Sequence, residues 1–194
     1  GASGLPGVVI KIIPDTETQS MMFESGELDI LDLDYAADSV DRFTETYPDQ
    51  IVQGPRVGIV YFTMNFNKEP FQDVRVRKAV QMSIDRQAIL DALYGGRGQV
   101  EQGIFPHGLI GFNPDQEEIK YDPEAAKALL AEAGYADGFE VTCVEEEIPV
   151  AVRMIETVQA YLAEGGITMN IQVVDTPTWQ EGLTNGTSQL TVGN

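Results

Sequence analysis

The last third of the sequence carries the pattern that most restricts how this chain can fold. Phe139–Val144 is an apolar run with strand composition, and Val150–Glu164 places apolar residues at helical spacing. Gly165-Gly166 ends the helical stretch, and Ile167–Val174 follows as a second run rich in β-branched residues. The order strand, helix, strand predicts a βαβ unit with two parallel strands and a right-handed crossover. The predicted fold class is therefore α/β, with a mixed sheet that contains this unit and helices packed on it.

Aspartates in front of helical stretches mark where most of the other helices are expected to begin. An aspartate at this position accepts a hydrogen bond from a free backbone N–H of the first turn. The expected helices are Asp15–Met22, Ala36–Thr46, Asp73–Ile84, Asp85–Gly95, Asp122–Gly134 and a short helix around Trp179. Further strands are expected at Val8–Ile13, Leu28–Leu33, Gln50–Gln53, Gly58–Asn65 and Gln189–Val192. The glycine-rich segment Gly98–Asn113 is expected to be a loop with at most one short strand.

The charge balance argues against two classes of partner. The chain has 31 acidic residues against 12 basic ones, a net charge of −19. Nucleic-acid binding leaves a basic surface, so this protein is not expected to bind nucleic acid, and an anionic membrane surface is disfavoured for the same reason. No apolar run approaches the ~20 residues of a membrane-spanning helix. The acidic surface is interpreted as a solvated, aggregation-resistant one, with a salt-rich habitat or a cationic ligand as alternatives.

The search for catalytic patterns predicts no enzyme. The chain has one histidine, His107, and one cysteine, Cys143, so neither a multi-histidine metal site nor a disulfide framework is expected. No serine lies in a G-x-S-x-G motif, and Tyr94–Gly98 lacks the Lys-Ser/Thr pair of a phosphate-binding loop. Cys143 lies in an apolar run, where a buried thiol acts as a small hydrophobe. No cofactor and no metal are predicted.

Two features at the ends of the predicted parallel strands remain as candidates for ligand binding. Glu145, Glu146 and Glu147 follow the first strand, and ligands approach an open α/β sheet at the carboxyl ends of its strands. The alternative is a solvated turn whose acids suit the dipole of the next helix. Trp179, the single tryptophan, follows the second strand and would stack against a ligand or fill the edge of the core. A ligand role requires an indole that is at least partly accessible, whereas a core role requires an enclosed one.

Motifs spread over most of the chain resemble one known family. Asn65–Ala79 with Ser83–Arg86 is close to the pattern N…PF-x-D-x-R-V-R-x-A…D-R, and Ser25–Ile30 is close to a G-E-x-D element. Tyr121–Tyr135 and the Gly165–Ile167 exit from a helix follow in the expected order. Together these segments resemble solute-binding protein family 5, the oligopeptide-, dipeptide- and nickel-binding components of ABC importers.

The resemblance implies how the chain is divided. Members of the family have two lobes that enclose the ligand, so residues 1–57 are expected to be a partial segment of the first lobe and residues 58–194 the second, periplasmic-binding-protein-like lobe. A hinge is expected near residues 54–58. The chain is expected to be a piece of a longer protein, because the family's opening segments and the Gly-Trp-x-x-Asp-like segment after the last strand are absent. The family's ligand-side positions fall near Tyr61, the Glu145–Glu147 segment and Trp179.

The resemblance also implies a function. The whole protein is expected to capture an oligopeptide or similar small solute outside the cell and to deliver it to the permease subunits of an ABC importer. Its expected location is periplasmic or extracellular, with a lipid anchor as one option. The alternative from another class is a ligand-sensing or protein-interaction module of a regulator, built on the same lobe. The motif residues Asp73, Arg75 and Asp85 are interpreted as structural groups rather than ligand contacts.

Overall fold

The computed structural model describes residue 4 and residues 6–33, 37–54 and 58–193. The chain divides into two units, residues 1–53 and residues 54–194. The boundary lies close to the one expected after residue 57, and residues 55–57 of the expected hinge lie outside the described residues. The assignment of the two units to two lobes of a larger protein remains a prediction.

The described part of unit 1 is organised by two helices. They are α1 (Thr16–Glu24) and α2 (Ala37–Thr46), followed by the 3₁₀ turn η1 (Pro48–Gln50). Asp15 begins α1 as predicted, because its Oδ1 accepts a hydrogen bond from the Thr18 N–H at 2.7 Å. The rings of Phe23, Phe43 and Tyr47 pack together with centroids 5.6–5.7 Å apart, and Phe43 is buried. These rings join the two helices.

Three strands predicted in unit 1 are wrong. Residues 8–13, 28–33 and 51–53 have no strand partner among the described residues, and Gln50 belongs to η1. The side chains of Val9 and Ile12 are 86% and 93% exposed. A strand forms only where a neighbouring strand takes up its backbone hydrogen bonds, and composition does not show whether that neighbour is present.

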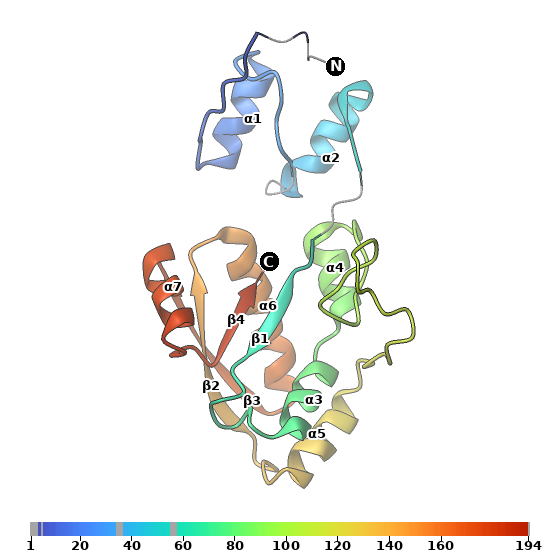
Figure 1. Ribbon diagram of the computed structural model, residues 1–194, viewed down its shortest axis with the longest axis vertical. Helices are drawn as coiled ribbons and strands as arrows, with labels where there is room; N and C mark the ends of the chain where they lie inside the picture. The colour runs from blue at the N-terminus through green and yellow to red at the C-terminus, as the bar shows by residue number, and fades with distance from the viewer. Residues whose placement is uncertain (1–3, 5, 34–36, 55–57, 194) are drawn as a thin grey trace. The chain divides into compact units, whose positions relative to one another are not determined.

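Unit 2 is built on a four-stranded mixed sheet. The strands are β1 (Tyr61–Met64), β2 (Phe139–Glu146), β3 (Ile167–Val174) and β4 (Leu190–Gly193), in the order β1-β4-β2-β3 (Figure 1). β2 is parallel to β3 and to β4, whereas β1 is antiparallel to β4. The predicted βαβ unit and mixed sheet are therefore confirmed. β1 is shorter than predicted, and β2 is two residues longer.

Five helices pack on or beside this sheet. They are α3 (Val74–Met82), α4 (Arg86–Tyr94), α5 (Pro123–Glu132), α6 (Pro149–Glu164) and α7 (Thr176–Thr184). Asp73, Asp85 and Asp122 cap their helices as predicted, and Asp175 caps α7 in the same way. The core lies between the sheet and the helices, and its fully buried side chains include Phe71, Val76, Leu130, Ile155, Leu162 and Ile167. In the described part of the chain, no helix is both long and apolar enough to cross a bilayer.

The arginines of the N…PF-x-D-x-R-V-R motif are used inside the unit. Arg75 Nη1 donates to the Glu132 carbonyl at 2.7 Å, which ties the start of α3 to the end of α5. Arg77 Nη1 donates to the Phe71 carbonyl at 2.6 Å. These bonds agree with the structural interpretation of the motif, since each guanidinium satisfies a backbone carbonyl at an element boundary.

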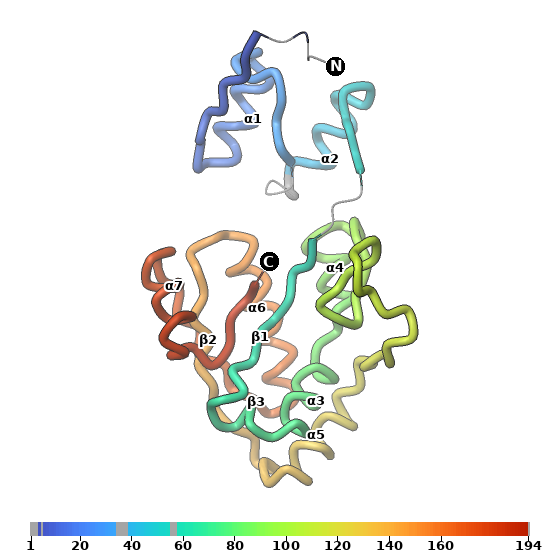
Figure 2. Tube along the Cα trace, in the orientation of Figure 1, coloured from blue at the N-terminus to red at the C-terminus, as the bar shows by residue number. Residues whose placement is uncertain are grey.

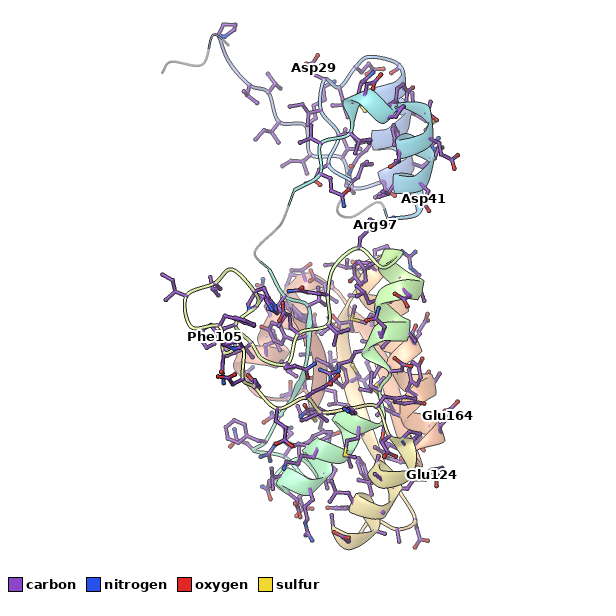
Figure 3. The ribbon with its side chains drawn as sticks, turned by 90° about the vertical axis from the view of Figure 1, so that its right-hand side faces the viewer. Asp29, Asp41, Arg97, Phe105, Glu124 and Glu164 are labelled. Carbon is purple, nitrogen blue, oxygen red and sulfur yellow. The ribbon has the colours of Figure 1, made fainter. Side chains whose placement is uncertain are left out.

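A long segment without helix or strand joins α4 to α5, as Figure 2 shows in the trace of residues 95–122. Arg86 anchors both of its ends, because its guanidinium donates to the carbonyls of Glu101 and Ile119. Phe105 projects from this segment on the opposite side of unit 2 from Glu164, at the end of α6 (Figure 3). The segment is a loop, as predicted, and the optional short strand is not present.

Candidate functional site at the carboxyl edge of the sheet

The strand register brings the sequence-predicted site residues to one edge of the sheet. The parallel strands β2 and β3 end together, with Glu146 paired with Val174. β4 also runs in this direction, and its last residue, Gly193, pairs with Tyr61 at the start of the antiparallel β1. This edge, where three strands end and β1 begins, is called the carboxyl edge below. It is the position at which open α/β sheets take up ligands.

The side chain of Tyr61 lies close to Gly193, its partner on β4. Its side chain is 40% exposed. A Cβ atom placed on Gly193 would lie 2.7 Å from the Cζ of Tyr61, so a side chain at this position would require the ring to move. Glycine at position 193 therefore leaves room for the Tyr61 ring at the last residue pair of β1 and β4. The ring remains partly exposed to solvent.

Glu145 is a strand residue, and this corrects the expectation that all three glutamates follow the strand. It is 2% exposed. Its carboxylate accepts hydrogen bonds from the Val192 N–H at 2.7 Å, the Glu146 N–H at 3.1 Å and the Thr191 hydroxyl at 3.3 Å. β2 and β4 are paired at Cys143 and Leu190. Beyond this pair, the Val192 N–H donates to the Glu145 carboxylate instead of to a backbone carbonyl.

The buried position changes the protonation behaviour of Glu145. Burial raises its pKa above the ordinary glutamate range, and the hydrogen bonds from Val192, Glu146 and Thr191 only partly offset this effect. The nearby charge of Glu146 acts in the same direction as burial. Cys143, on the same strand, is also buried, and desolvation raises the pKa of its thiol to about 12, so it stays neutral.

The other two glutamates have different surroundings. Glu146 is half-buried, and its carboxylate accepts a hydrogen bond from the Thr176 hydroxyl at the start of α7. Glu147 is exposed, and its N–H donates to the Val174 carbonyl at 3.0 Å. The three acids predicted as one group thus divide into one buried group, one that fastens α7 and one that faces solvent.

Trp179 reaches the sheet from α7. Its indole Nε1 donates to the Thr191 hydroxyl oxygen at 2.8 Å, and the side chain is half-buried. The residue is therefore partly accessible to solvent, as a ligand role requires. Its contact with a ligand stays a prediction.

Sequence reasoning missed Thr191 and Gly193. Thr191 is 4% exposed and accepts from Trp179 while donating to Glu145, and Gly193 provides room for Tyr61. Neither residue belongs to a recognisable motif. Their roles depend on which strand and helix lie beside β4, so no local signal marks them.

Two small hollows lie elsewhere in unit 2. One, of about 140 Å³, is lined by the loop between α4 and α5, including Glu101, His107 and Phe112, and a second of about 160 Å³ is lined by Arg86 and Tyr121 among others. Both are below the ~300–1,000 Å³ of typical ligand pockets. His107 fastens this loop, because its Nδ1 lies 2.9 Å from Glu101 Oε1 and its ring centroid 3.9 Å from that of Phe112. Within residues 4, 6–33, 37–54 and 58–193, no three His, Cys, Asp or Glu side chains group as metal ligands would.

Comparison with known proteins gives consistent matches to one family. The model of the bacterial extracellular solute-binding proteins, family 5, middle region, matches residues 2–194. The heme-binding protein A of Haemophilus influenzae is 32% identical over 88% of this chain and 32% of its own length. The dipeptide-binding protein of Escherichia coli is 30% identical over 91% of this chain and 33% of its own length.

A solved structure shows the same fold. The periplasmic binding protein DppA of Helicobacter pylori, in complex with a peptide, superposes with a TM-score of 0.83 at 24% identity. The match covers 93% of this chain and 35% of that protein. The chain thus spans about a third of the length of the relatives it matches. With the family model matched over residues 2–194, this chain belongs to the bacterial extracellular solute-binding proteins of family 5.

Proposed function

We propose that the whole protein is the substrate-binding component of an ABC importer, which captures an oligopeptide or a similar small solute outside the cell. The observation that carries this proposal is the family match over residues 2–194. The family consists of solute-binding proteins, and we therefore propose that this protein catalyses no reaction. The proposed location is periplasmic or extracellular, with a lipid anchor as an option.

The carboxyl edge is the proposed ligand-facing part of unit 2. Tyr61 and Trp179 offer partly exposed aromatic surface, and Glu146 and Glu147 offer carboxylates near it. Aromatic faces bind apolar or planar groups, and the carboxylates favour a cationic group such as a peptide amine. Glu145 contributes to this edge from inside, because its carboxylate is occupied by donors of the protein itself.

The proposed mechanism is closure of two lobes about the ligand. A ligand that contacts both lobes stabilises the closed conformation over the open one, and the population shifts by the difference in affinity. The hinge is proposed near residues 54–58. The permease subunits would then receive the ligand from the closed form.

The relatives differ in what their names say they bind, heme in one case and dipeptides in another. The deciding experiment is therefore a thermal-shift screen of the full-length protein against peptides, heme, oligosaccharides and metal chelates. We expect one class to raise the melting temperature, since a ligand that binds only the native state stabilises it. Tyr61→Ala should reduce the shift, whereas Tyr121→Ala, which removes an equally exposed ring elsewhere (each 40% exposed), should not.

The regulator alternative makes a different prediction. A DNA-binding domain encoded in the same gene would favour a sensor, whereas a signal peptide or lipoprotein cysteine upstream would favour the importer. The comparisons above give the regulator no support, because the relatives named are binding proteins. A full-length protein that is stabilised by none of the four ligand classes would contradict the proposal.

A further inference from the structure

A chain of hydrogen bonds links the buried carboxylate of Glu145 to the indole of Trp179. Glu145 lies on β2, Thr191 on β4 and Trp179 on α7. Thr191 Oγ1 lies 3.3 Å from Glu145 Oε2 and 2.8 Å from Trp179 Nε1. The chain therefore joins three elements that are brought together only by the tertiary fold.

The chemistry of the three groups gives this chain a direction. The indole N–H can only donate, so the Thr191 oxygen is the acceptor in the bond to Trp179. The single proton of the Thr191 hydroxyl is then directed to Glu145, or more weakly to the Val192 carbonyl at 3.4 Å. An ionised carboxylate accepts and never donates, and hydrogen bonds to a charged acceptor are about twice as strong as neutral ones. The direction runs from Trp179 through Thr191 to Glu145.

We propose that Glu145 is a positioning residue for Trp179, because its ionised carboxylate orients the Thr191 hydroxyl, which in turn holds the indole at the carboxyl edge. Protonation of Glu145 weakens this hold. The proposal rests on the proposed function only in giving the indole a role toward a ligand. The coupling between Glu145 and Trp179 is a property of the ligand-free protein.

The surroundings of Glu145 support such a role. The electrostatic influence on its carboxyl comes from Glu146 on its own strand, and the Cys143 thiol nearby is neutral. β4 and α7 contribute the neutral donors Val192 N–H, Thr191 hydroxyl and, through Thr191, the indole N–H. β3 contributes Val173 at the paired position. Burial of the carboxyl acts in the same direction as the charge of Glu146, and both raise its pKa.

The test uses the 194-residue chain without ligand, in which Trp179 is the single tryptophan and gives one indole N–H signal in an NMR spectrum. We expect this signal to shift with pH in one step whose midpoint lies above the ordinary glutamate value of about 4.3. In Glu145→Gln the step should be lost. In the matched control Glu147→Gln, which removes an exposed carboxylate two residues further along the chain, the step should remain.

A second variant covers the case in which Glu145→Gln does not fold. Thr191→Val keeps the titrating carboxyl and removes the hydroxyl, so the indole signal should no longer follow the titration. An indole signal that does not move with pH, or a step that persists in Glu145→Gln or Thr191→Val, overturns the proposal. Because no ligand is added, this failure is distinct from a failure of the thermal-shift screen, which tests the proposed function.

Discussion

Replacement of Glu145 by alanine removes the acceptor that holds the end of β4. The Val192 N–H, in a residue only 7% exposed, then loses a 2.7 Å hydrogen bond. A buried donor left without a partner costs about 1–3 kcal/mol, and the truncated side chain leaves a cavity in addition. Glu145→Gln keeps an oxygen for Val192 at nearly the same volume, so it should retain most of the stability. We expect Glu145→Ala to be less stable than Glu145→Gln by about 2 kcal/mol.

The assay is thermal unfolding of both variants and the wild type, followed by circular dichroism. For a domain of this size, about 1 kcal/mol corresponds to roughly 2–4 °C in Tm. The predicted difference between the two variants is therefore about 4–8 °C. Equal melting temperatures at pH 7 would refute the view that Glu145 supplies the acceptor for Val192.

The pH dependence gives a second test of the same reasoning. Burial raises the pKa of Glu145 in the folded protein above its unfolded value. The folded protein therefore favours the neutral, protonated carboxyl. The stability gained from this form is fully present below the unfolded pKa and is lost as the pH rises through the folded pKa. Glutamine does not titrate, so the Tm of Glu145→Gln relative to wild type should increase from pH 4 to pH 7. A difference that is constant over this range would refute a raised pKa.

Three further predictions concern the site and the loop. Trp179→Ala should weaken ligand binding by the full-length protein by about 1–3 kcal/mol, measured by calorimetry, because the indole is proposed as a ligand contact. The half-buried position of the residue predicts little loss of stability. A large loss of stability with unchanged affinity would indicate a core role instead. Arg86→Ala should increase hydrogen exchange in the loop between α4 and α5, because Glu101 and Ile119 lose a common donor, whereas Arg77→Ala should leave that loop unchanged. The 194-residue chain alone should bind short peptides poorly, because it spans about a third of its relatives' length and would supply only part of an enclosing site; micromolar binding in calorimetry would contradict this.

The protonation form of Glu145 that favours stability is not the form that favours its proposed role. An ionised carboxylate in a buried position costs folding free energy, and the neutral form would be the more stable one. The ionised form is nevertheless the better acceptor for Thr191 and hence for the indole chain. If Glu145→Gln is more stable than wild type at neutral pH and no longer holds the Trp179 indole in place, it would be an example of the trade-off between stability and function.

The helices of this protein could be predicted from the sequence because their signals are local. Asp15, Asp73, Asp85 and Asp122 each accept from a backbone N–H two or three residues ahead, so the cap and the helix it begins lie in one short stretch. The βαβ unit was predicted for a similar reason, since the helix and its flanking strands are consecutive. The family motifs were also readable, and their arginines proved to satisfy nearby carbonyls.

All four strands of the sheet in unit 2 overlap predicted ones, but which of the remaining predicted strands form, and how the candidate site is built, depended on pairing that the sequence does not show. Residues 8–13 have the composition of a strand, yet no described strand lies beside them. Glu145 and Glu146 follow an apolar run and suggest a loop, but pairing with Val173 and Val174 extends β2 through both.

Distance along the chain is the physical reason for this difference. A helix closes its hydrogen bonds within four residues, so its sequence contains nearly all the information that determines it. A strand needs a partner that can lie anywhere in the chain: Thr63 on β1 pairs with Thr191 on β4, 128 residues away. The sequence by itself therefore determined the helices, the βαβ unit and the family. Only the tertiary structure decided that Glu145 is buried, that Thr191 joins it to Trp179, and that Tyr61 lies close to Gly193.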